Sequence, residues 1–464
     1  MTTINYKKSA LLGLAGLALA GCATLSPDGG MSSIQKDTQA RLGKDIKIAK
    51  TEAEQQAITD RVNELLKEPL SADCAVQIAL LNNKGLQASL YEVGISEADL
   101  VQATRLPNPR FSMLYAKNGG DFKIEQILTF NIFSLFTIPL AKEIGERQLA
   151  QTKAMVTLDV LRLAGDTRKS YFNAIAAEQA VAYMQQVTTA AEASNELARK
   201  MTEAGNFSKR DQAREQVFYA EVTAEAARTK QAEVAAREQL IRHLGLWGAQ
   251  TQFNLPERLP ELPKELTEQT NIEATAMKQR LDIVAMQQEM AGLAKNLGLT
   301  KVTRFINVLE IGPARVLEGK RSDPYKKGVE ISLELPIFDF GTAKVAKAEA
   351  IYMQAMSRAA EQAVNARSEV REAYLNYRTT YDIAKHYRDE IVPLRKRISD
   401  ENTLRYNGML MSVFELLTDA QTQVTAVHGY IQALRDFWVA ESELEMALAG
   451  KPAAIMNTEK ELQK

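Results

Sequence analysis

The amino-acid sequence predicts a mainly α-helical fold with a smaller β-barrel portion. Long segments without proline place apolar residues at helical spacing, and four shorter segments alternate apolar and polar residues at strand spacing. Both patterns occur twice, because the plan of residues 107–249 is repeated in residues 302–450. Such an internal duplication indicates that two similar structural units build one wall.

The spacing of landmark residues supports this duplication. Tyr171 and Tyr374 lie 203 positions apart in the two repeats. Pro139 and Pro336 lie only 197 positions apart. If these prolines are equivalent, the second repeat carries six additional residues between its proline and its tyrosine.

Residues 1–21 are expected to be a lipoprotein signal peptide. A short basic region precedes the apolar run 10–20, which is too short to span a bilayer as a mature helix. The run ends in Leu19-Ala20-Gly21-Cys22, which is similar to the lipobox of bacterial lipoproteins. This resemblance implies cleavage before Cys22 and acylation, for example with palmitate, and Ala23 favours the outer membrane. The alternative is an ordinary signal peptide with a coincidental cysteine.

The remaining sequence divides into five further segments. Residues 22–71 are polar apart from the amphipathic stretch Gln55–Leu66, and residues 246–271 are rich in proline. Helical stretches at Ala72–Thr104 and Ile272–Leu297 precede the strand pairs of the two repeats. The predicted organisation is a lipidated segment (22–71), a first repeat (72–249), a connector (250–271), a second repeat (272–450) and a tail (451–464).

Four segments alternate with the two-residue period of a strand. Transmembrane strands need about 9–11 residues and one apolar face, and these segments match that pattern. Asn118–Asp121 is expected to form a tight hairpin turn, and Pro313–Pro324 a longer charged loop. The apolar faces carry Phe111, Met113 and Tyr115; alternate residues from Phe122 to Ile132; Phe305, Leu309 and Ile311; and Val329, Ile331, Leu333 and Leu335.

Four strands are too few to close a membrane barrel, because the smallest such barrels have about eight. An open edge in lipid would leave backbone groups unpaired. We therefore predict a homotrimer in which three chains build one twelve-stranded barrel surrounded by outer-membrane lipid. The alternative is a soluble four-stranded sheet packed on helices.

Each repeat also predicts a long antiparallel helical hairpin. An outgoing helix of roughly 65 residues would reach nearly 100 Å. Apolar residues such as Leu158, Tyr171 and Ile175 recur at steps of three and four, which favours packing like that of a coiled coil. Pro393 is expected to kink the outgoing helix of the second hairpin. The predicted segments are 140–204 and 208–245 in the first repeat, and 341–407 and 411–449 in the second.

Several segments resemble landmarks of the TolC-like outer-membrane factor family. The resemblance covers about residues 72–450, and a lipobox is typical of the lipidated members. It implies a trimeric exit duct whose barrel continues into a periplasmic helical tunnel. It also implies work with a periplasmic adaptor protein and an inner-membrane pump, in efflux or type I secretion. The landmarks are Ala79–Asn83, Pro107–Pro109, Leu335–Gly341, Glu203–Asn206 and Tyr406–Gln421.

The resemblance implies that the two helix reversals are periplasmic tips at which the adaptor docks. Gly205 and Gly408 mark these reversals, and a reversal favours a residue that is comfortable at positive φ. The alternative is that these glycines only turn the chain. The residues concerned are Ala204, Gly205 and Asn206 in the first tip, and Asn407, Gly408 and Met409 in the second.

The resemblance also implies a constriction ringed by acidic residues just after the second tip. Glu415 and Asp419 occupy the nearest positions, and their spacing of four places both carboxylates on one helix face. In a trimer each would form a ring of three that favours cations. One extra residue before Asp419 departs from the family pattern, and the alternative is a solvated acidic face.

Composition and motifs argue against catalysis and against nucleic-acid binding. The formal net charge of −1 provides no basic field for nucleic acid. The histidines His243, His386 and His428 lie in no ligand-spaced pair, and nucleotide-binding and nucleophile motifs are absent from the sequence. We therefore expect no enzymatic activity, no cofactor and no resident metal.

Two classes of function remain open from the sequence. The first is a passive conduit in the outer membrane, lipid-anchored and with a large periplasmic portion. The second is a lipid-anchored periplasmic coiled-coil structural or adaptor protein without a pore. An adaptor would contain one helical hairpin, whereas this sequence predicts two, each preceded by a strand pair of bilayer length.

Overall fold

The computed structural model describes residues 24–266, 268, 270–305 and 308–450. The signal peptide, the lipidation residue Cys22 and the C-terminal tail lie outside these described residues. Within the described ranges, no helix combines the length and the hydropathy that crossing a membrane would require. The chain divides into two compact units that take segments from both repeats: unit 1 contains Leu90–Val156 and Leu281–Ala363, and unit 2 contains Gln35–Ser89, Thr157–Arg280 and the residues from Val364 onward.

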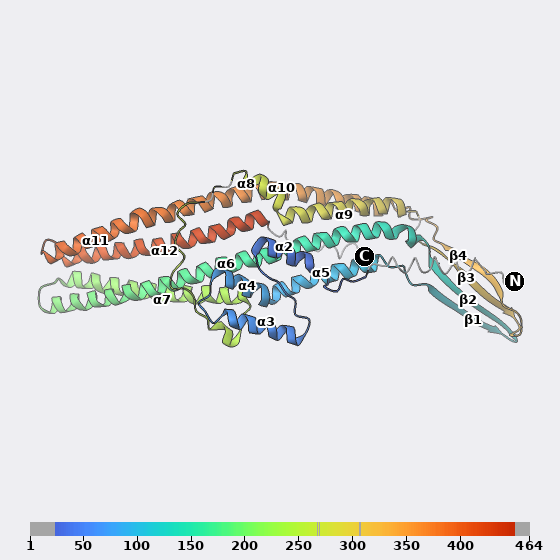
Figure 1. Ribbon diagram of the computed structural model, residues 1–464, viewed down its shortest axis with the longest axis horizontal. Coiled ribbons are helices and arrows are strands. Elements are labelled where there is room, and N and C mark those ends of the chain that lie inside the picture. Colours follow the sequence, from blue (N-terminus) through green and yellow to red (C-terminus); the bar gives the residue numbers. More distant parts are fainter. Residues whose placement is uncertain (1–23, 267, 269, 306–307, 451–464) are drawn as a thin grey trace, which may run out of the picture. The chain divides into compact units, whose positions relative to one another are not determined.

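All four strands of unit 1 pair in one antiparallel sheet, in the order β1-β2-β3-β4 (Figure 1). Each strand pairs with the next one along the chain, so the sheet is a simple meander. The predicted turn at Asn118–Asp121 is confirmed as a two-residue hairpin. The strands are β1 (Arg110–Asn118), β2 (Asp121–Asn131), β3 (Leu309–Gly319) and β4 (Lys326–Leu333).

The expected loop at Pro313–Pro324 is wrong, because β3 continues through its first half to Gly319. Pro313 pairs with Val329 of β4, whereas Gly312 and Pro313 have no partner in the β2 register. Proline is tolerated where a strand lacks a ladder bond on one side. At Gly312 a Cβ would lie 1.7 Å from the Leu128 carbonyl oxygen, so glycine permits the close approach of β2.

Two strand boundaries also differ from the prediction. The third strand does not include Arg304 or Phe305, because helix α9 extends to Thr303 and these residues form the following turn. The Arg304 guanidinium carbon lies 4.2 Å from the centre of the Phe305 ring. Strand β2 ends at Asn131, because helix α6 already begins at Phe133.

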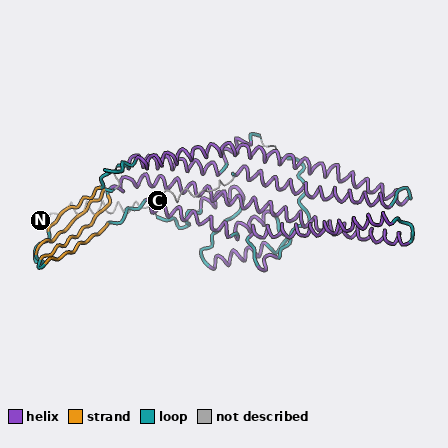
Figure 2. The backbone as a smooth tube through the Cα atoms, turned by 180° about the vertical axis from the view of Figure 1, so that it is seen from behind, coloured by secondary structure: helices purple, strands orange, loops and turns teal. Residues whose placement is uncertain are grey.

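The long helical hairpins are confirmed (Figure 2). Pro139 lies inside α6, in its second turn, whereas Pro336 lies in the irregular segment before α10. These prolines are therefore not equivalent, and the expectation of six additional residues in the second repeat is wrong. The helices are α6 (Phe133–Glu203) and α7 (Lys209–Leu244) in the first repeat, and α10 (Thr342–His386), α11 (Val392–Asn407) and α12 (Val413–Ala449) in the second.

The helical stretch before the first strand pair is broken into α4 (Ala72–Asn82) and α5 (Lys84–Ala103). Asn82 Nδ2 donates to the carbonyl of Gly245 at 2.7 Å, and Asn83 Nδ2 donates to the carbonyl of His243 at 2.9 Å. The last carbonyls of a helix lack partners within the helix. The break therefore delivers two amide donors to the carbonyl end of α7.

In the second repeat, a charged residue donates to the carbonyl end of the returning helix. Arg280 separates α8 (Ile272–Gln279) from α9 (Leu281–Thr303), and its side chain is fully buried. The guanidinium donates to the Ala447 carbonyl, near the end of α12, at 3.0 Å and to Glu369 at 2.9 Å. Both repeats therefore use a break between two short helices to satisfy the end of their returning helix.

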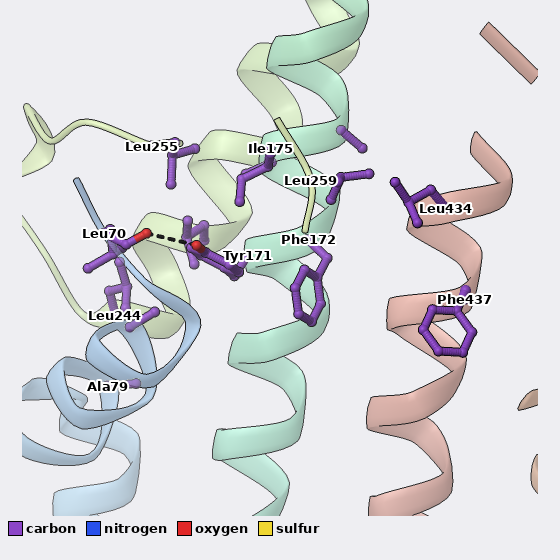
Figure 3. Close-up of a cluster of buried hydrophobic side chains, with 14 of the residues drawn as sticks. Leu70, Ala79, Tyr171, Phe172, Ile175, Leu244, Leu255, Leu259, Leu434 and Phe437 are labelled. Carbon is purple, nitrogen blue, oxygen red and sulfur yellow. Dashed lines mark hydrogen bonds between the residues drawn. The ribbon is translucent and has the colours of Figure 1, made fainter. Parts of the chain in front are cut away.

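Unit 2 has a hydrophobic core to which the aromatic residues Tyr171, Phe172 and Phe437 and the connector residues Leu255 and Leu259 contribute (Figure 3). Phe172 stacks on Trp438 with ring centres 5.4 Å apart, and Phe437 contacts Trp438 edge-on. The Tyr171 hydroxyl donates to the Leu70 carbonyl at 2.8 Å, and burial raises the pKa of Tyr171 to about 12. The connector contributes the 3₁₀ turn Gly248–Thr251 and buried leucines, among them Leu255, Leu259 and Leu262.

The N-terminal segment contains two helices. The predicted amphipathic stretch is confirmed as α3 (Glu52–Leu65), which begins with a capping box between Thr51 and Glu54. Helix α2 (Ser32–Leu42) was not expected, because its sequence is polar and shows no clear apolar stripe.

We predict that Arg280→Met lowers the free energy of unfolding by about 3–5 kcal/mol, because it leaves Glu369 and a helix-end carbonyl without their buried donor. The matched control is Arg371→Met, which removes an exposed ion pair to Glu273 (3.6 Å). Chemical denaturation of the detergent-solubilised protein measures both. Equal losses for the two variants would contradict the structural role of Arg280.

Candidate functional site

The first helix reversal, between α6 and α7, ends in a Schellman motif. Asn206 N–H donates to the Met201 carbonyl at 2.9 Å, and Gly205 N–H donates to the Thr202 carbonyl at 3.0 Å. Gly205 has a φ of 79°, as the sequence predicted for this position. Ala204, Gly205 and Asn206 are all exposed.

The second reversal, between α11 and α12, uses the same motif with a different residue at the left-handed position. Leu410 N–H donates to the Arg405 carbonyl at 2.9 Å, and Met409 N–H donates to the Tyr406 carbonyl at 3.0 Å. Met409 has a φ of 59°, whereas Gly408 has a φ of −81°. The expectation that Gly408 takes the positive φ is therefore wrong, because the motif places the reversal one residue later.

This shift makes Gly205 equivalent to Met409. The side chains of Met409 and Leu410 are 94% and 82% exposed, so the second tip presents an apolar pair. At the matching positions the first tip carries only Gly205 and Asn206. Asn407 and Gly408 are also exposed, so all six predicted tip residues lie on the surface.

Matching serine caps start the two returning helices. Ser208 caps α7, and its hydroxyl donates to the Asp211 carboxylate at 2.6 Å. This hydrogen bond, aided by Arg210 and Arg214, holds the pKa of Asp211 below its usual range. Ser412 caps α12 through a capping box with Glu415. The signature of serine followed three residues later by an acid is readable in the sequence, but it was not recognised there.

The capping box assigns Glu415 a local role that the sequence analysis missed. Its carboxylate accepts from the Ser412 backbone N–H at 3.0 Å and from the Ser412 hydroxyl at 3.1 Å. Asp419 lies one turn further along α12 and is half-buried. Its Oδ2 atom is shielded from solvent and has no hydrogen-bond partner among the described residues. The two predicted aperture residues therefore have different surroundings within one chain.

A groove of 560 Å³ connects the two reversals within unit 2. Its walls combine aromatic and apolar side chains with two guanidinium groups and a carboxylate. Sequence reasoning did not bring these residues together, because they come from two hairpins that are about 200 positions apart. The lining residues are Met201, Phe207, Arg210, Asp211, Arg214, Tyr406 and Ser412.

The outgoing helix of the second hairpin changes its winding above the tip. Tyr387–Ile391 form a π-helical turn just before Pro393, which lies in the first turn of α11. A proline lacks the N–H of an α-helical bond, and a π turn accommodates this loss. At Gly429 a Cβ would lie 2.9 Å from the Tyr387 ring, so glycine admits this ring. The kink expected at Pro393 remains a prediction, and the structure places a π turn immediately before α11.

The connector contacts the second hairpin on the side of this π turn that is farther from the tip. The Tyr381 hydroxyl donates to the Lys264 carbonyl at 2.9 Å, and the Trp438 indole donates to the Pro260 carbonyl at 3.1 Å. Between the π turn and the tip, α11 has no buried residue. This segment of the outgoing helix therefore contributes no residue to the buried core of the chain.

The sheet of unit 1 has two distinct faces, which follow from the strand register, because directly paired residues lie on the same face. One face, here called the apolar face, includes Phe111, Met113, Tyr115, Ile124, Leu128, Phe130, Ile311, Val329, Ile331 and Leu333. The other, here called the polar face, includes Ser112, Lys123, Glu125, Thr129, Glu310, Glu318, Lys326, Glu330 and Ser332. Many apolar-face side chains are exposed, for example Val329 at 71% and Phe111 at 62%.

Comparison with solved structures identifies this combination of sheet and hairpins. The outer-membrane channel OprN matches with a TM-score of 0.68 at 15% identity, over 93% of this chain and 97% of OprN. VceC, an outer-membrane protein of Vibrio cholerae, matches with a TM-score of 0.67 at 14% identity, over 85% of this chain and 98% of VceC. The chain has the fold of the TolC-like outer-membrane channels.

Two further comparisons agree with the TolC-like fold. A membrane protein from Pseudomonas aeruginosa matches with a TM-score of 0.71 at 17% identity, over 82% of this chain and 93% of that chain. The cobalt-zinc-cadmium resistance protein CzcC of Cupriavidus metallidurans is 23% identical over 288 residues, which are 58% of this chain and 64% of CzcC. The match thus spans less than two thirds of CzcC. No family model matches the sequence.

We predict opposite effects of substitution at the two left-handed positions. Met409→Gly removes a strained side chain and should stabilise the second tip by about 1 kcal/mol, and Gly205→Ala should destabilise the first by a similar amount. Hydrogen exchange at the amides of Leu410 and Asn206 reports these local changes. Exchange should slow about fivefold at Leu410 in the first variant and accelerate about fivefold at Asn206 in the second. Effects of the same sign would contradict the assignment.

Proposed function

We propose that this protein is a trimeric outer-membrane channel that serves as the passive exit duct of a tripartite efflux or type I secretion system. The observation that carries the proposal is the sheet of unit 1, which combines an exposed apolar face with two unpaired edges. The similar structures support the location, since OprN and VceC are outer-membrane proteins.

The edges of the sheet argue for a shared barrel. Among the residues that the structure describes, β1 and β4 pair on one side only. In a bilayer the unpaired N–H and C=O groups of an edge would each be unfavourable by several kcal/mol. Pairing β1 of one copy with β4 of the next removes both edges, and three copies close a barrel of twelve strands. The polar face would then line the lumen, and the apolar face would contact lipid.

The two tips are proposed as the docking site of a periplasmic adaptor that links the duct to an inner-membrane pump. The groove between the tips offers Arg210, Arg214 and Tyr406 as polar contacts. Met409 and Leu410 beside it supply exposed apolar area. Such a combination of apolar anchor and polar rim is typical of protein interfaces.

Asp419 is the stronger candidate for the aperture. Glu415 already serves as a helix cap, whereas the shielded Oδ2 atom of Asp419 has no partner among the described residues of one chain. In a trimer three such carboxylates would form a negative ring. Cations would be favoured at this ring, and the similar protein CzcC is named for resistance to cobalt, zinc and cadmium.

Opening is proposed to occur by movement of the lower second hairpin. The π turn at Tyr387–Ile391 separates the part that contacts the connector from α11, which has no buried residue. A passive duct needs no enzymatic step. Acylation of Cys22, which lies outside the described residues, would anchor the chain in the outer membrane.

The proposed function predicts that detergent-purified protein is a trimer that forms pores in planar bilayers. Light scattering gives the mass of the protein in its detergent micelle, and single-channel recording gives the conductance. A variant with Cys22→Ala tests the anchor separately, since the barrel alone should still insert. A monomer that dissolves without detergent and forms no pore would contradict the proposal.

Substitution at the aperture should separate the two acids. Asp419→Asn should raise single-channel conductance or weaken block by divalent cations, because it removes the proposed ring of charge. Glu415→Gln, which keeps the helix cap, is the matched control and should change conductance less. If Asp419→Asn leaves conductance and block unchanged, Asp419 does not form the constriction.

A further inference from the structure

Charged residues are distributed unequally between the two faces of the sheet. All carboxylates of the four strands, from Asp121, Glu125, Glu310, Glu318 and Glu330, lie on the polar face. Three bases on this face have acidic partners. Lys123 pairs with Glu125 at 2.9 Å, Arg110 with Glu310 at 3.8 Å, and Lys326 with Glu318 at 3.9 Å.

The apolar face carries three bases and no acid. Lys117, Arg315 and Lys327 occupy the same alternating positions as the exposed aromatic and aliphatic residues of their strands. All three side chains are exposed, and within the described parts of the chain none has an acidic partner. Arg315 and Lys327 are directly paired across β3 and β4. Two like charges at such positions repel each other unless an anion lies between them.

Arg315 and Lys327 lie at one level of the sheet, and Lys117 lies level with Gly319, four residues nearer the hairpin ends. Lys117 immediately precedes the turn after β1, and Lys327 is the second residue of β4. Aromatic rings lie beside two of them: the Lys117 ammonium is 5.6 Å from the Phe122 ring centre, and the Arg315 guanidinium is 4.5 Å from that of Tyr325. The apolar residues Val329, Ile331 and Leu333 occupy the remaining length of β4 toward the helices. A charge on the lipid face is strongly unfavourable at the midplane and tolerated near the interface.

We propose that Arg315 and Lys327 form a binding site for a phosphate group of a phosphorylated glycolipid in the outer leaflet. The proposal rests on the proposed function, in which the apolar face contacts lipid and the helices are periplasmic. The hairpin turns then lie at the outer surface, where such headgroups occur. Side chains that start about 5 Å apart can contact one phosphate together. The anion neutralises the repulsion, and the neighbouring aromatic rings suit the interfacial level.

The probe is lipid A, the phosphorylated glycolipid anchor of lipopolysaccharide, added to purified, delipidated trimer. Heat-induced dissociation of the trimer is followed as lipid A is titrated. Fully dephosphorylated lipid A tests the requirement for phosphate, and inorganic phosphate tests whether the free ion suffices. Only intact lipid A should raise the dissociation temperature of the unsubstituted protein.

The decisive variant is Arg315→Gln with Lys327→Gln. It should raise the lipid A concentration needed for half-maximal stabilisation about thirtyfold. Each base removed should contribute a factor of about five, and the two factors multiply. The matched control is Lys320→Gln with Arg321→Gln, which removes two charges from the loop of the same hairpin and should shift the titration far less. The sheet should form in both variants, because no ion pair within the described residues is lost.

Equal titrations for the decisive and control variants would overturn the proposal. So would equal stabilisation by lipid A and its dephosphorylated form. A trimer that conducts normally but whose dissociation temperature does not change with lipid A contradicts this inference alone. A chain that forms neither trimer nor pore contradicts the proposed function as well.

Discussion

The backbone at the two edges of a four-stranded sheet is the constraint on which the account depends. Within the described part of the chain, β1 and β4 each have one row of unpaired N–H and C=O groups, and one face of the same sheet is apolar and exposed. In water such a sheet would be prone to edge-to-edge association, and in lipid its edges would be strongly unfavourable. In the proposed trimer, pairing with neighbouring copies would satisfy the edges, and lipid would cover the apolar face.

The ends of the helices obey the same requirement for partners. Each returning helix receives side-chain donors from the break between two short helices, through Asn82 and Asn83 in one repeat and Arg280 in the other. Both reversals use a Schellman motif and a serine cap. The two repeats therefore satisfy the ends of their helices in the same way, although the residues differ. The second tip differs most, because Met409 stands where the first tip has Gly205.

Much of the fold could be predicted from the sequence, because alternation and helical periodicity are strong in long elements. The two hairpins and the four strands were expected, although α6 begins seven residues earlier than predicted and β3 ends later, whereas the π turn and the role of Gly408 were not. The positive φ predicted for Gly408 was wrong, because a glycine near a reversal suggests positive φ. The hydrogen-bond register decides which residue adopts it. Pro313 misled because proline suggests a loop, while the missing ladder partner on the β2 side permits it within a strand. The groove between the tips depends on tertiary contacts that no local pattern encodes.

The most direct measurement is disulfide crosslinking between strand edges in intact cells. Each variant would carry one cysteine in β1 and one in β4, for example Ser112→Cys with Ser332→Cys, in a Cys74→Ser background. The cysteines would then be oxidised. Closure predicts covalent dimers and trimers in denaturing gels for the pairs in register, because β1 of one copy lies beside β4 of the next. If every pair along both edges yields only monomers, the shared barrel does not exist.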